Sequence, residues 1–271
     1  GILDKKIADA IVKACDEILD GHLHEYFIVD PIQGGAGTSL NMNANEVIAN
    51  RAIEILGGNK GDYSIVNPND HVNCGQSTND VIPTAGKMTS LRLLEHAQEE
   101  LRRLHHALCE KADEFNSIIK MGRTQMQDAV PIRLGQEFRA YSNAIQRDIN
   151  RMDKAMDEMR SLNLGGTAIG TGINADKKYL KRIVPNLCTI TGMEFVQSFD
   201  LIDATQNLDP FVAVSGSVKA CAVTLSKIAN DLRLMSSGPR AGFGEINLPA
   251  KQNGSSIMPG KVNPVIPEVV N

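Results

Sequence analysis

The polar residues best suited to chemistry lie in one segment near the end of the chain. Residues 254–264 read Gly-Ser-Ser-Ile-Met-Pro-Gly-Lys-Val-Asn-Pro. Ser255 and Ser256 follow a flexible glycine, two prolines restrict the backbone, and Lys261 and Asn263 stand two residues apart. Hydroxyl and amide groups donate hydrogen bonds to carboxylate oxygens without titrating, and a lysine adds positive charge. By composition alone, the segment fits a functional loop and a proline-punctuated surface loop equally well.

Two further polar segments stand just ahead of expected long helices. Residues 75–80 read Gly-Gln-Ser-Thr-Asn-Asp, and residues 122–129 read Gly-Arg-Thr-Gln-Met-Gln-Asp-Ala. Loops carry function on rigid scaffolds more often than helices do. Loops rich in Gly, Ser, Thr and Asn are expected at Gly34–Asn45, Asn73–Asp80, Gly122–Asp128, Gly165–Asn174 and Gly238–Pro264.

Several common kinds of site are disfavoured. Residues 170–175 fit a loose G-x-G-x-x-A pattern, but a helical stretch precedes them where a dinucleotide site needs a strand, and no P-loop lysine motif occurs. His105 and His106 are adjacent on an expected helix, so their side chains diverge, and no H-E-x-x-H spacing favours a metal. No G-x-S-x-G elbow suggests a hydrolase triad. We expect solvated surface histidines, and a structural role for His71.

The composition is that of a globular protein and not of a nucleic-acid binder. The 271 residues allow one large domain or two smaller ones, and a net charge of -4 argues against a cationic face for phosphates. No run approaches the roughly 18 apolar residues of a membrane helix, and no signal peptide is visible. The chain lacks an initiator Met, which suggests a fragment. Scattered cysteines without a CxxC pair indicate reduced thiols of a cytosolic protein: Cys15, Cys74, Cys109, Cys188 and Cys221.

The elements that must position the polar segments are helices. Apolar residues recur at spacings of three, four and seven in three long stretches. This pattern predicts helices over Thr84–Phe115, Ile132–Leu162 and Ala204–Met235. Shorter helices are expected at Asp4–Leu19, Asn45–Leu56 and Asp176–Thr191, and short strands only near Tyr26–Val29 and Phe195–Val196. Such long helices with 4% aromatic residues suit a bundle, so the predicted fold class is mainly α.

The segment at 254–264 matches, at every defined position, the signature loop G-S-S-x-M-P-x-K-x-N-P of the aspartase/fumarase superfamily of lyases. Residues 77–80 resemble the superfamily's S-T-N-D loop, and residues 122–129 its G-R-T-x-x-Q-D-A loop, in the expected order. The resemblance covers essentially the whole chain. It implies a mainly α, long-helix bundle of the aspartase/fumarase type that is truncated at both ends. Residues 1–75 would be part of an N-terminal mixed helical domain, and residues 76–271 part of the central long-helix bundle domain.

Residues 29–43 distinguish the branches of the superfamily. They read Val-Asp-Pro-Ile-Gln-Gly-Gly-Ala-Gly-Thr-Ser-Leu-Asn-Met-Asn and resemble the aspartase branch, which interconverts L-aspartate with fumarate and ammonia. Class II fumarases carry a tryptophan-containing variant, and this chain has no Trp. Gln125 stands where fumarases have a His thought to pair with a carboxylate that would correspond to Glu268, and both His and Gln occur there among aspartases. Because ammonia leaves without an added proton, Gln125 suits an ammonia-lyase; a class II fumarase (malate/fumarate hydratase) is the alternative.

The resemblance also implies roles for single residues. Ser255 would act as an alkoxide base that removes the proton beside the β-carboxylate of aspartate, through an aci-carboxylate intermediate. Its loop must supply N–H donors and positive charge, above all from Lys261, and the backbone N–H of Ser256 would bind substrate. The β-carboxylate would be held by Ser77, Thr78 and Asn79, the α-carboxylate by Thr124, Lys261 and Asn263, and the amino group by Thr38, Asn79 and Gln125.

By the same resemblance, the protein would be a cytoplasmic homotetramer whose active sites are shared among three subunits. Its partner would be a small dicarboxylate, with no nucleic acid and no membrane. No cofactor is implied for catalysis, and divalent-cation activation, known for some aspartases, stays open. Thr38 and Asn79 could instead cap helices, and we expect Arg123 and Asp128 to brace their loop. A catalytically silent relative, like the lens crystallins of this superfamily, is disfavoured because the serine and lysine of the signature loop are retained.

Overall fold

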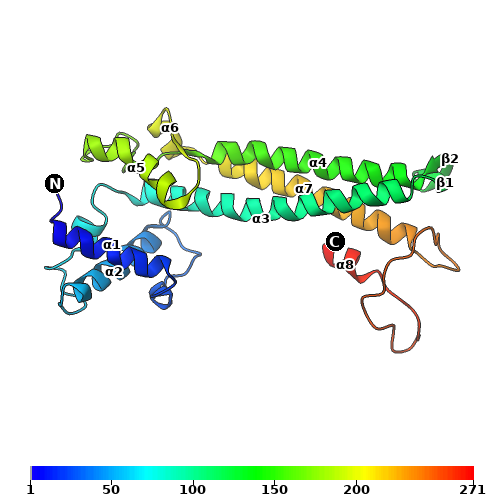
Figure 1. The fold of residues 1–271 in the computed structure, drawn as a ribbon, viewed down its shortest axis with the longest axis horizontal. Helices are drawn as coiled ribbons and strands as arrows, with labels where there is room; N and C mark the ends of the chain where they lie inside the picture. Colours follow the sequence, from blue (N-terminus) through cyan, green and yellow to red (C-terminus); the bar gives the residue numbers. More distant parts are fainter. Residues whose placement is uncertain (1) are drawn as a thin grey trace. The chain divides into compact units, whose positions relative to one another are not determined.

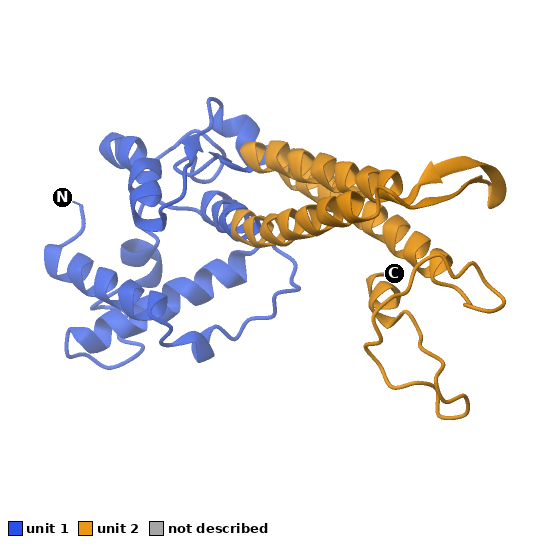
Figure 2. Cartoon of the chain, turned by 45° about the vertical axis from the view of Figure 1, so that its right-hand side comes forward, with its two compact units in different colours: residues 1–90, 159–208 blue, residues 91–158, 209–271 orange. Residues whose placement is uncertain are grey.

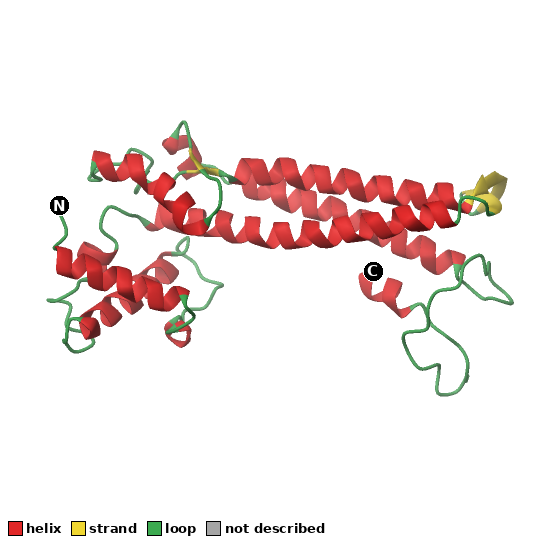
Figure 3. Cartoon of the chain, in the orientation of Figure 1, coloured by secondary structure: helices red, strands yellow, loops and turns green. Residues whose placement is uncertain are grey.

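The computed structural model describes residues 2–271, and helices make up most of it (Figure 3). Three long helices dominate: α3 (Thr78–Glu114), α4 (Leu134–Met159) and α7 (Asp209–Met235). The chain divides into two compact units, residues 1–90 with 159–208 (unit 1) and residues 91–158 with 209–271 (unit 2) (Figure 2). The mainly α fold class is confirmed. The units group residues by contact, and the expected domain boundary between residues 75 and 76 stays a prediction.

Unit 2 is a bundle in which α4, α7 and the part of α3 from Leu91 onward lie side by side (Figure 1). The apolar residues that predict α3 and α4 line its core. Buried side chains of the two helices are Leu91, Leu94, Leu101, Leu108, Ile145, Ile149, Met152, Met156 and Met159. They recur at spacings of three, four and seven residues, so each helix buries one continuous stripe, as the sequence pattern predicts.

Helix α7 differs, because much of its apolar surface is exposed. Ile228 is buried, but Val212, Val218 and Val223 are 69%, 44% and 65% exposed. The short helix α8 (Val265–Val270) packs on α7 in the same unit. A helix that is apolar on several faces needs more partners than unit 2 supplies.

The segment ahead of α4 is a β-hairpin, where the sequence suggested a loop at Gly122–Asp128. Strand β1 (Ile119–Thr124) pairs antiparallel with β2 (Gln127–Arg133). Gln125 and Met126 form its turn, with φ of 52° and 62°. Two positive φ values fit the tight turn that joins adjacent strands. Such turns favour Asn and Gly, so Gln-Met gave no turn signal in the sequence.

Unit 1 contains the shorter helices. They are α1 (Lys5–Leu19), α2 (Thr38–Ile55), α5 (Lys177–Thr191) and α6 (Leu201–Gln206). A core of Ala10, Ala49, Ala52, Ile53, Val66 and Val72 joins α1, α2 and a single π-helical turn, η2 (Pro68–Val72). Strand β3 (Ser161–Leu162) pairs with β4 (Val196–Gln197), which fits the strand expected near Phe195. The strand expected at Tyr26–Val29 is wrong, because a 3-10 turn, η1 (His24–Tyr26), occupies its start.

Three helices begin or break away from the expected residues. Helix α2 begins at Thr38 instead of Asn45, after Gly37 in a left-handed conformation (φ 88°). The expected helix Ala204–Met235 is interrupted between α6 and α7, because Pro210 has no N–H to donate to the carbonyl four residues back, that of Gln206. The expected helix Ile132–Leu162 is shorter, since its first residues belong to β2 and its last to β3.

Helix α3 begins at Thr78, six residues before the expected Thr84, and so contains Pro83. A proline cannot donate to the carbonyl four residues back, here that of Asn79. The buried side chain of Asn163 replaces the missing donor, with its Nδ2 2.9 Å from the Asn79 carbonyl oxygen. A side chain from a distant part of the chain therefore completes the first turns of α3.

Candidate active site

The residues 77–79, expected to hold a carboxylate, form the beginning of α3. Ser77 lies just before the helix, and its Oγ accepts a hydrogen bond from the backbone N–H of Asn79 at 3.2 Å. In return, the N–H of Ser77 donates to Asp80 Oδ1 at 3.0 Å. This reciprocal pair is a capping box, in which Asp takes the place of the usual Glu. Because the cap holds the turn, the positions of Ser77, Thr78 and Asn79 are set by the local sequence.

Asp80 also fixes a second loop. Its side chain is fully buried, and Oδ2 accepts from the N–H groups of Gly165 and Thr167 at 3.1 and 3.0 Å. Burial raises the pKa of this carboxyl, while the backbone donors act in the opposite direction. Asn79 reinforces the contact, since its Nδ2 donates to the Ala168 carbonyl at 2.7 Å. The helix start and the 165–168 loop are therefore one rigid assembly.

Thr38 lies at the first turn of α2, close to the same helix start. A side chain at Gly37 would place its Cβ 2.9 Å from Ile82 Cγ2, so α2 and α3 approach closely at this point. Thr38 is exposed, and its Oγ1 donates to the Gly35 carbonyl at 2.8 Å. One turn further along α2, Asn41 Nδ2 lies 3.0 Å from Thr78 Oγ1. Unit 1 thus brings the predicted residues Thr38, Ser77, Thr78 and Asn79 to one place.

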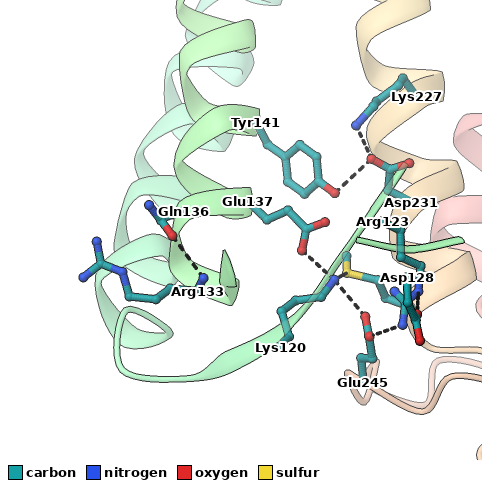
Figure 4. Close-up of polar contacts among 11 residues, drawn as sticks. Lys120, Arg123, Asp128, Arg133, Gln136, Glu137, Tyr141, Lys227, Asp231 and Glu245 are labelled. Carbon is teal, nitrogen blue, oxygen red and sulfur yellow. Dashed lines mark hydrogen bonds and ion pairs between the residues drawn. The ribbon is translucent and has the colours of Figure 1, made fainter. Parts of the chain in front are cut away.

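In unit 2, the hairpin turn carries the predicted residues Thr124 and Gln125, both exposed. The base of the hairpin is held by a buried charge network, shown in Figure 4. Lys120 Nζ lies 2.8 Å from both Glu137 Oε2 and Glu245 Oε2. Arg123 Nη2 lies 2.5 Å from Glu245 Oε1, and its guanidinium stacks 4.0 Å from the centre of the Phe243 ring.

The network links the hairpin to the loop that follows α7. Burial alone would raise the pKa of Glu245, but the hydrogen bonds from Arg123 and Lys120 outweigh it and lower that pKa. Asp128 completes the group at 3.9 Å from Arg123 Nε. Arg123 therefore braces its loop, as the sequence suggested. His71 likewise has a structural contact, because its Nδ1 lies 3.0 Å from the N–H of Asn67.

The loop that carries the proposed base closes on itself. A Cβ at Gly254 would lie 3.2 Å from both the Gly260 nitrogen and the Lys261 oxygen, so the residue before Ser255 touches the backbone beside Lys261. Ser255 is half-buried, and Ser256 and Lys261 are exposed. Within residues 2–271, none of these three side chains forms a hydrogen bond or ion pair.

A cavity of about 1000 Å³ in unit 2 brings part of this loop to the hairpin turn. Lys261 and Asn263 line it together with Met126, the second turn residue, and with Arg233 and Asn247. Ser255 and Ser256 do not line it. The cavity joins two predicted α-carboxylate ligands and leaves the predicted base outside its wall.

Two groups of polar residues around the site were not predicted. The first is Asn41, Asn45 and Asn73, which contact one another beside Thr78. Their signal was the spacing of Asn41 and Asn45 by four, but Asn41 was expected in a loop and Asn45 at the boundary between that loop and a helix. The second is the Lys120 and Glu245 contact, for which sequence spacing offers no signal, because the partners are far apart in the chain.

Comparison with known proteins supports the superfamily on independent grounds. A protein-family model described as "Lyase" matches residues 1–271. The chain therefore belongs to this lyase family, which agrees with the motifs of the aspartase/fumarase superfamily and with the long-helix bundle.

Individual relatives show which members of the family the chain resembles. The chain is 59% identical over 265 residues to the aspartate ammonia-lyase of Bacillus subtilis (strain 168), covering 98% of this chain and 56% of that protein. It is 51% identical over 270 residues to the aspartate ammonia-lyase of Escherichia coli (strain K12), covering 99% and 56%. The chain thus spans little more than half the length of these relatives.

Two solved structures share the fold. A cobalt-bound fumarate lyase:delta crystallin from Brucella melitensis superposes with a TM-score of 0.95 at 55% identity, covering 99% of this chain and 58% of that one. A class II fumarase from Schistosoma mansoni superposes with a TM-score of 0.89 at 38% identity, covering 100% and 60%. The bundle of unit 2 and the helices of unit 1 are therefore those of this superfamily.

Proposed function

We propose that the full-length protein is an aspartate ammonia-lyase, which interconverts L-aspartate with fumarate and ammonia. The observation that carries the proposal is 51–59% identity to proteins of that name along nearly the whole chain, with the signature loop intact. The geometry agrees with this proposal, because uncharged donors and acceptors converge at the start of α3. Hydroxyl and amide groups can bind a dicarboxylate without changing their own protonation state.

The reaction needs a base for a very weakly acidic proton. Ser255, as an alkoxide, takes the proton from the carbon next to the β-carboxylate. The electron pair moves into that carboxylate and gives an aci-carboxylate dianion, whose collapse forms the double bond and breaks the C–N bond, releasing ammonia. Lys261 supplies the positive charge that stabilises the alkoxide, and the closed 254–261 loop supplies backbone donors.

The donors and acceptors in unit 1 suit the β-carboxylate and the amino group of aspartate. Ser77, Thr78 and Asn79 would face the β-carboxylate, where negative charge accumulates. Asn79 Nδ2 is engaged by Ala168, which leaves its amide oxygen to accept from the substrate ammonium. Thr38 donates its hydrogen to Gly35, so its oxygen can also accept from an ammonium. Both residues therefore support binding of the amino group.

The α-carboxylate would be bound in unit 2. Lys261 and Asn263 line one cavity, and Thr124 is the last residue of β1, just before the turn that carries the lining residue Met126. Gln125, in that turn, would contact the amino group together with Thr38 and Asn79. The backbone N–H of Ser256 is a further donor for the substrate. Charge develops on the β-carboxylate instead, where each preorganised donor contributes roughly 3–4 kcal/mol to barrier reduction.

A class II fumarase is the second candidate, favoured by the fold shared with the Schistosoma mansoni enzyme. Gln125 argues against it. A hydroxyl leaving as water needs a proton, which an amide cannot donate near neutral pH, whereas an amino group leaves as neutral ammonia.

We further propose a cytoplasmic homotetramer with active sites shared among three subunits. Its support is the exposed apolar surface of α7. By length and composition this helix could also cross a membrane, and little of it is buried within the described structure, but it carries Lys219 near its middle. A mid-membrane lysine is costly, so helices of other subunits are the better partners.

No cofactor is proposed for catalysis. Among residues 2–271, no three His, Cys, Asp or Glu side chains lie close enough to hold a metal ion. Activation by a divalent cation is a separate property that titration of the full-length protein with magnesium would test.

The test is fumarate formation, followed by its ultraviolet absorbance, from L-aspartate and separately from L-malate. We expect signal with aspartate, its loss in Ser255→Ala, and none with malate. Signal with malate alone would make the protein a fumarase and overturn the ammonia-lyase assignment.

A further inference from the structure

We propose that Asn41 is a positioning residue that turns the hydroxyl of Thr78 so that its hydrogen points to the substrate carboxylate. Asn41 lies on α2, and Thr78 is the first residue of α3. The inference rests on the proposed function, because it assigns to Thr78 the β-carboxylate of a dicarboxylate substrate. No motif role in the sequence identified Asn41.

Three asparagines and Thr78 form a chain of contacts inside unit 1. Asn41 and Asn45 are only 5% and 6% exposed. Their Nδ2 atoms lie 3.4 and 3.1 Å from the same acceptor, Asn73 Oδ1. Asn41 Nδ2 lies in addition 3.0 Å from Thr78 Oγ1, whereas Asn45 forms no hydrogen bond with Thr78. The two asparagines thus share burial and acceptor, and differ in one contact.

A backbone carbonyl determines the direction of every hydrogen bond in this chain. The other end of the Asn73 amide lies 3.3 Å from the Gln76 carbonyl oxygen. A carbonyl can only accept, so Asn73 must present its NH2 group to Gln76 and its oxygen to the helix. Asn41 and Asn45 must then present their NH2 groups to that oxygen. Because Asn41 reaches Thr78 with the same nitrogen, Asn41 donates and Thr78 accepts.

The consequence falls on the hydrogen of the Thr78 hydroxyl. A threonine hydroxyl has one hydrogen to donate, and here its oxygen is already an acceptor. Within residues 2–271, the hydroxyl has no acceptor of its own. Its hydrogen therefore remains available to a ligand. Thr38 shows the reverse polarity, since its hydrogen is used on Gly35 and its oxygen remains available.

These polarities match the two groups that the substrate presents. A carboxylate only accepts hydrogen bonds, and an ammonium only donates them. Charge builds up on the β-carboxylate in the aci-carboxylate intermediate, so a donor aimed there stabilises the transition state more than the bound substrate. The chain from Gln76 through Asn73 and Asn41 contains no ionisable group, so the orientation of Thr78 holds over a wide pH range.

The sharpest test is Asn41→Asp, with Asn45→Asp as its matched control. Both variants place a carboxylate of the same size at an equally buried position next to Asn73. Only in Asn41→Asp would the new carboxylate accept a hydrogen bond from the Thr78 hydroxyl, which would then have no hydrogen left to donate to the substrate. We expect Asn41→Asp to lower kcat for L-aspartate by about 10²-fold, as for loss of one oxyanion donor, with a smaller change in KM. Asn45→Asp should lower kcat at least about tenfold less, because it leaves the donor in place.

Asn41→Ala, alone and combined with substitutions of Thr78, keeps the test decisive if Asn41→Asp disturbs folding. Asn41→Ala leaves the hydroxyl free to rotate and should cost about tenfold in kcat. In a Thr78→Ala background, which lacks the hydroxyl, Asn41→Ala should cause no further loss, whereas in Thr78→Ser it should act as in wild type. Equal kcat losses in the Asn41 and Asn45 variants, or additive losses with Thr78→Ala, would overturn the proposal.

Binding separates this proposal from the assignment of the reaction. Isothermal titration of succinate, a dicarboxylate that cannot eliminate ammonia, measures carboxylate recognition in the full-length protein. If wild type produces no fumarate from aspartate, the proposed function fails. The inference is still supported if Asn41→Asp weakens succinate binding at least about tenfold more than Asn45→Asp does, and it is overturned if both variants bind succinate equally.

Discussion

The turn at residues 77–80 and the loop at residues 254–264 differ in how their side chains are held. In the turn, Ser77 and Asp80 cap each other, Thr78 contacts Asn41, and Asn79 contacts Ala168. In the loop, the described structure shows no hydrogen bond or ion pair for the side chains of Ser255, Ser256 or Lys261. One region is fixed by its own chain, and the other keeps its polar groups unengaged.

This difference indicates how the two regions could divide the work of the proposed elimination. Groups that hold a substrate gain from being fixed in advance, because their orientation is then not lost again on binding. A base must meet the reacting carbon, and in the proposed tetramer it would do so in contact with loops of other subunits. Changes in the turn should therefore affect stability, and changes in the loop should affect activity alone.

The largest effect expected is from Ser255→Ala. Removal of a general base lowers kcat by about 10²–10⁴-fold. Because the Ser255 hydroxyl has no partner within residues 2–271, the thermal unfolding midpoint should stay that of wild type. Steady-state kinetics and a melting curve on the same preparation measure both. A fall in the midpoint that parallels the loss of activity would contradict the comparison.

Asp80→Asn tests the opposite region. In the wild type, the Asp80 carboxylate accepts hydrogen bonds from the backbone N–H groups of Ser77, Gly165 and Thr167. The substitution places an NH2 group, which can only donate, against these donors. An unsatisfied buried donor costs about 1–3 kcal/mol, so the free energy of unfolding in urea should fall by that amount. Asp176→Asn is the matched control: its exposed side chain caps α5 through one oxygen, which Asn retains, and it should unfold like wild type.

Glu245→Gln compares two parts of unit 2: the hairpin, which the charge network holds, and the 254–264 loop, which the network does not contact. Because the pKa of Glu245 is lowered from its ordinary value of 4.5, its charge stabilises the folded state fully at any pH above 4.5. This stabilisation is lost as the pH falls through the lowered pKa. At neutral pH the substitution should cost about 1–2 kcal/mol, between an exposed and a buried ion pair.

The measurement for Glu245 is the difference in thermal midpoint between wild type and Glu245→Gln, at neutral pH and in acid. The difference should shrink as the pH falls, because protonation removes the same charge. Glu137→Gln is the control, since it loses one contact to Lys120 and keeps the link to the loop after α7. If the difference in thermal midpoint stayed constant with pH, the charge of Glu245 would not be what stabilises this network.

The smallest effect compares two serines. Ser77→Ala removes a helix cap and should cost about 1 kcal/mol of stability, whereas Ser256→Ala removes a hydroxyl without a partner and should cost close to none. Urea unfolding of both variants measures the pair. Equal losses of stability would mean that the loop is held as firmly as the turn.

The helices could be predicted from the periodic spacing of their buried apolar residues. Their ends could not be predicted, because polar residues determine them. The stripes of α3 and α4 follow spacings of three and four that any amphipathic helix shows. The beginnings of α2 and α3 lie in runs of Gly, Ser, Thr and Asn, which favour loops and caps alike. Pro83 was a strong reason to start α3 after it, and only a contact from Asn163 overrides that preference.

The sequence predicts candidate site residues, but it does not predict the contacts that hold them. The motifs named Thr38, Ser77, Thr78 and Asn79, and the structure brings them together. The polarity of their hydroxyls depends on Gly35 and Asn41, which act through hydrogen bonds that sequence spacing does not encode. The link from Glu245 to Arg123 joins residues 122 positions apart, beyond the reach of a local pattern.

The contact between Asn163 and the Asn79 carbonyl has a consequence for the order of events on the ribosome. The two residues are 84 positions apart, and the chain is made from its N-terminus. Until Asn163 emerges, the carbonyl that Pro83 leaves without a donor must be hydrated. The turn at the start of α3 therefore matures late, after α4 has been translated.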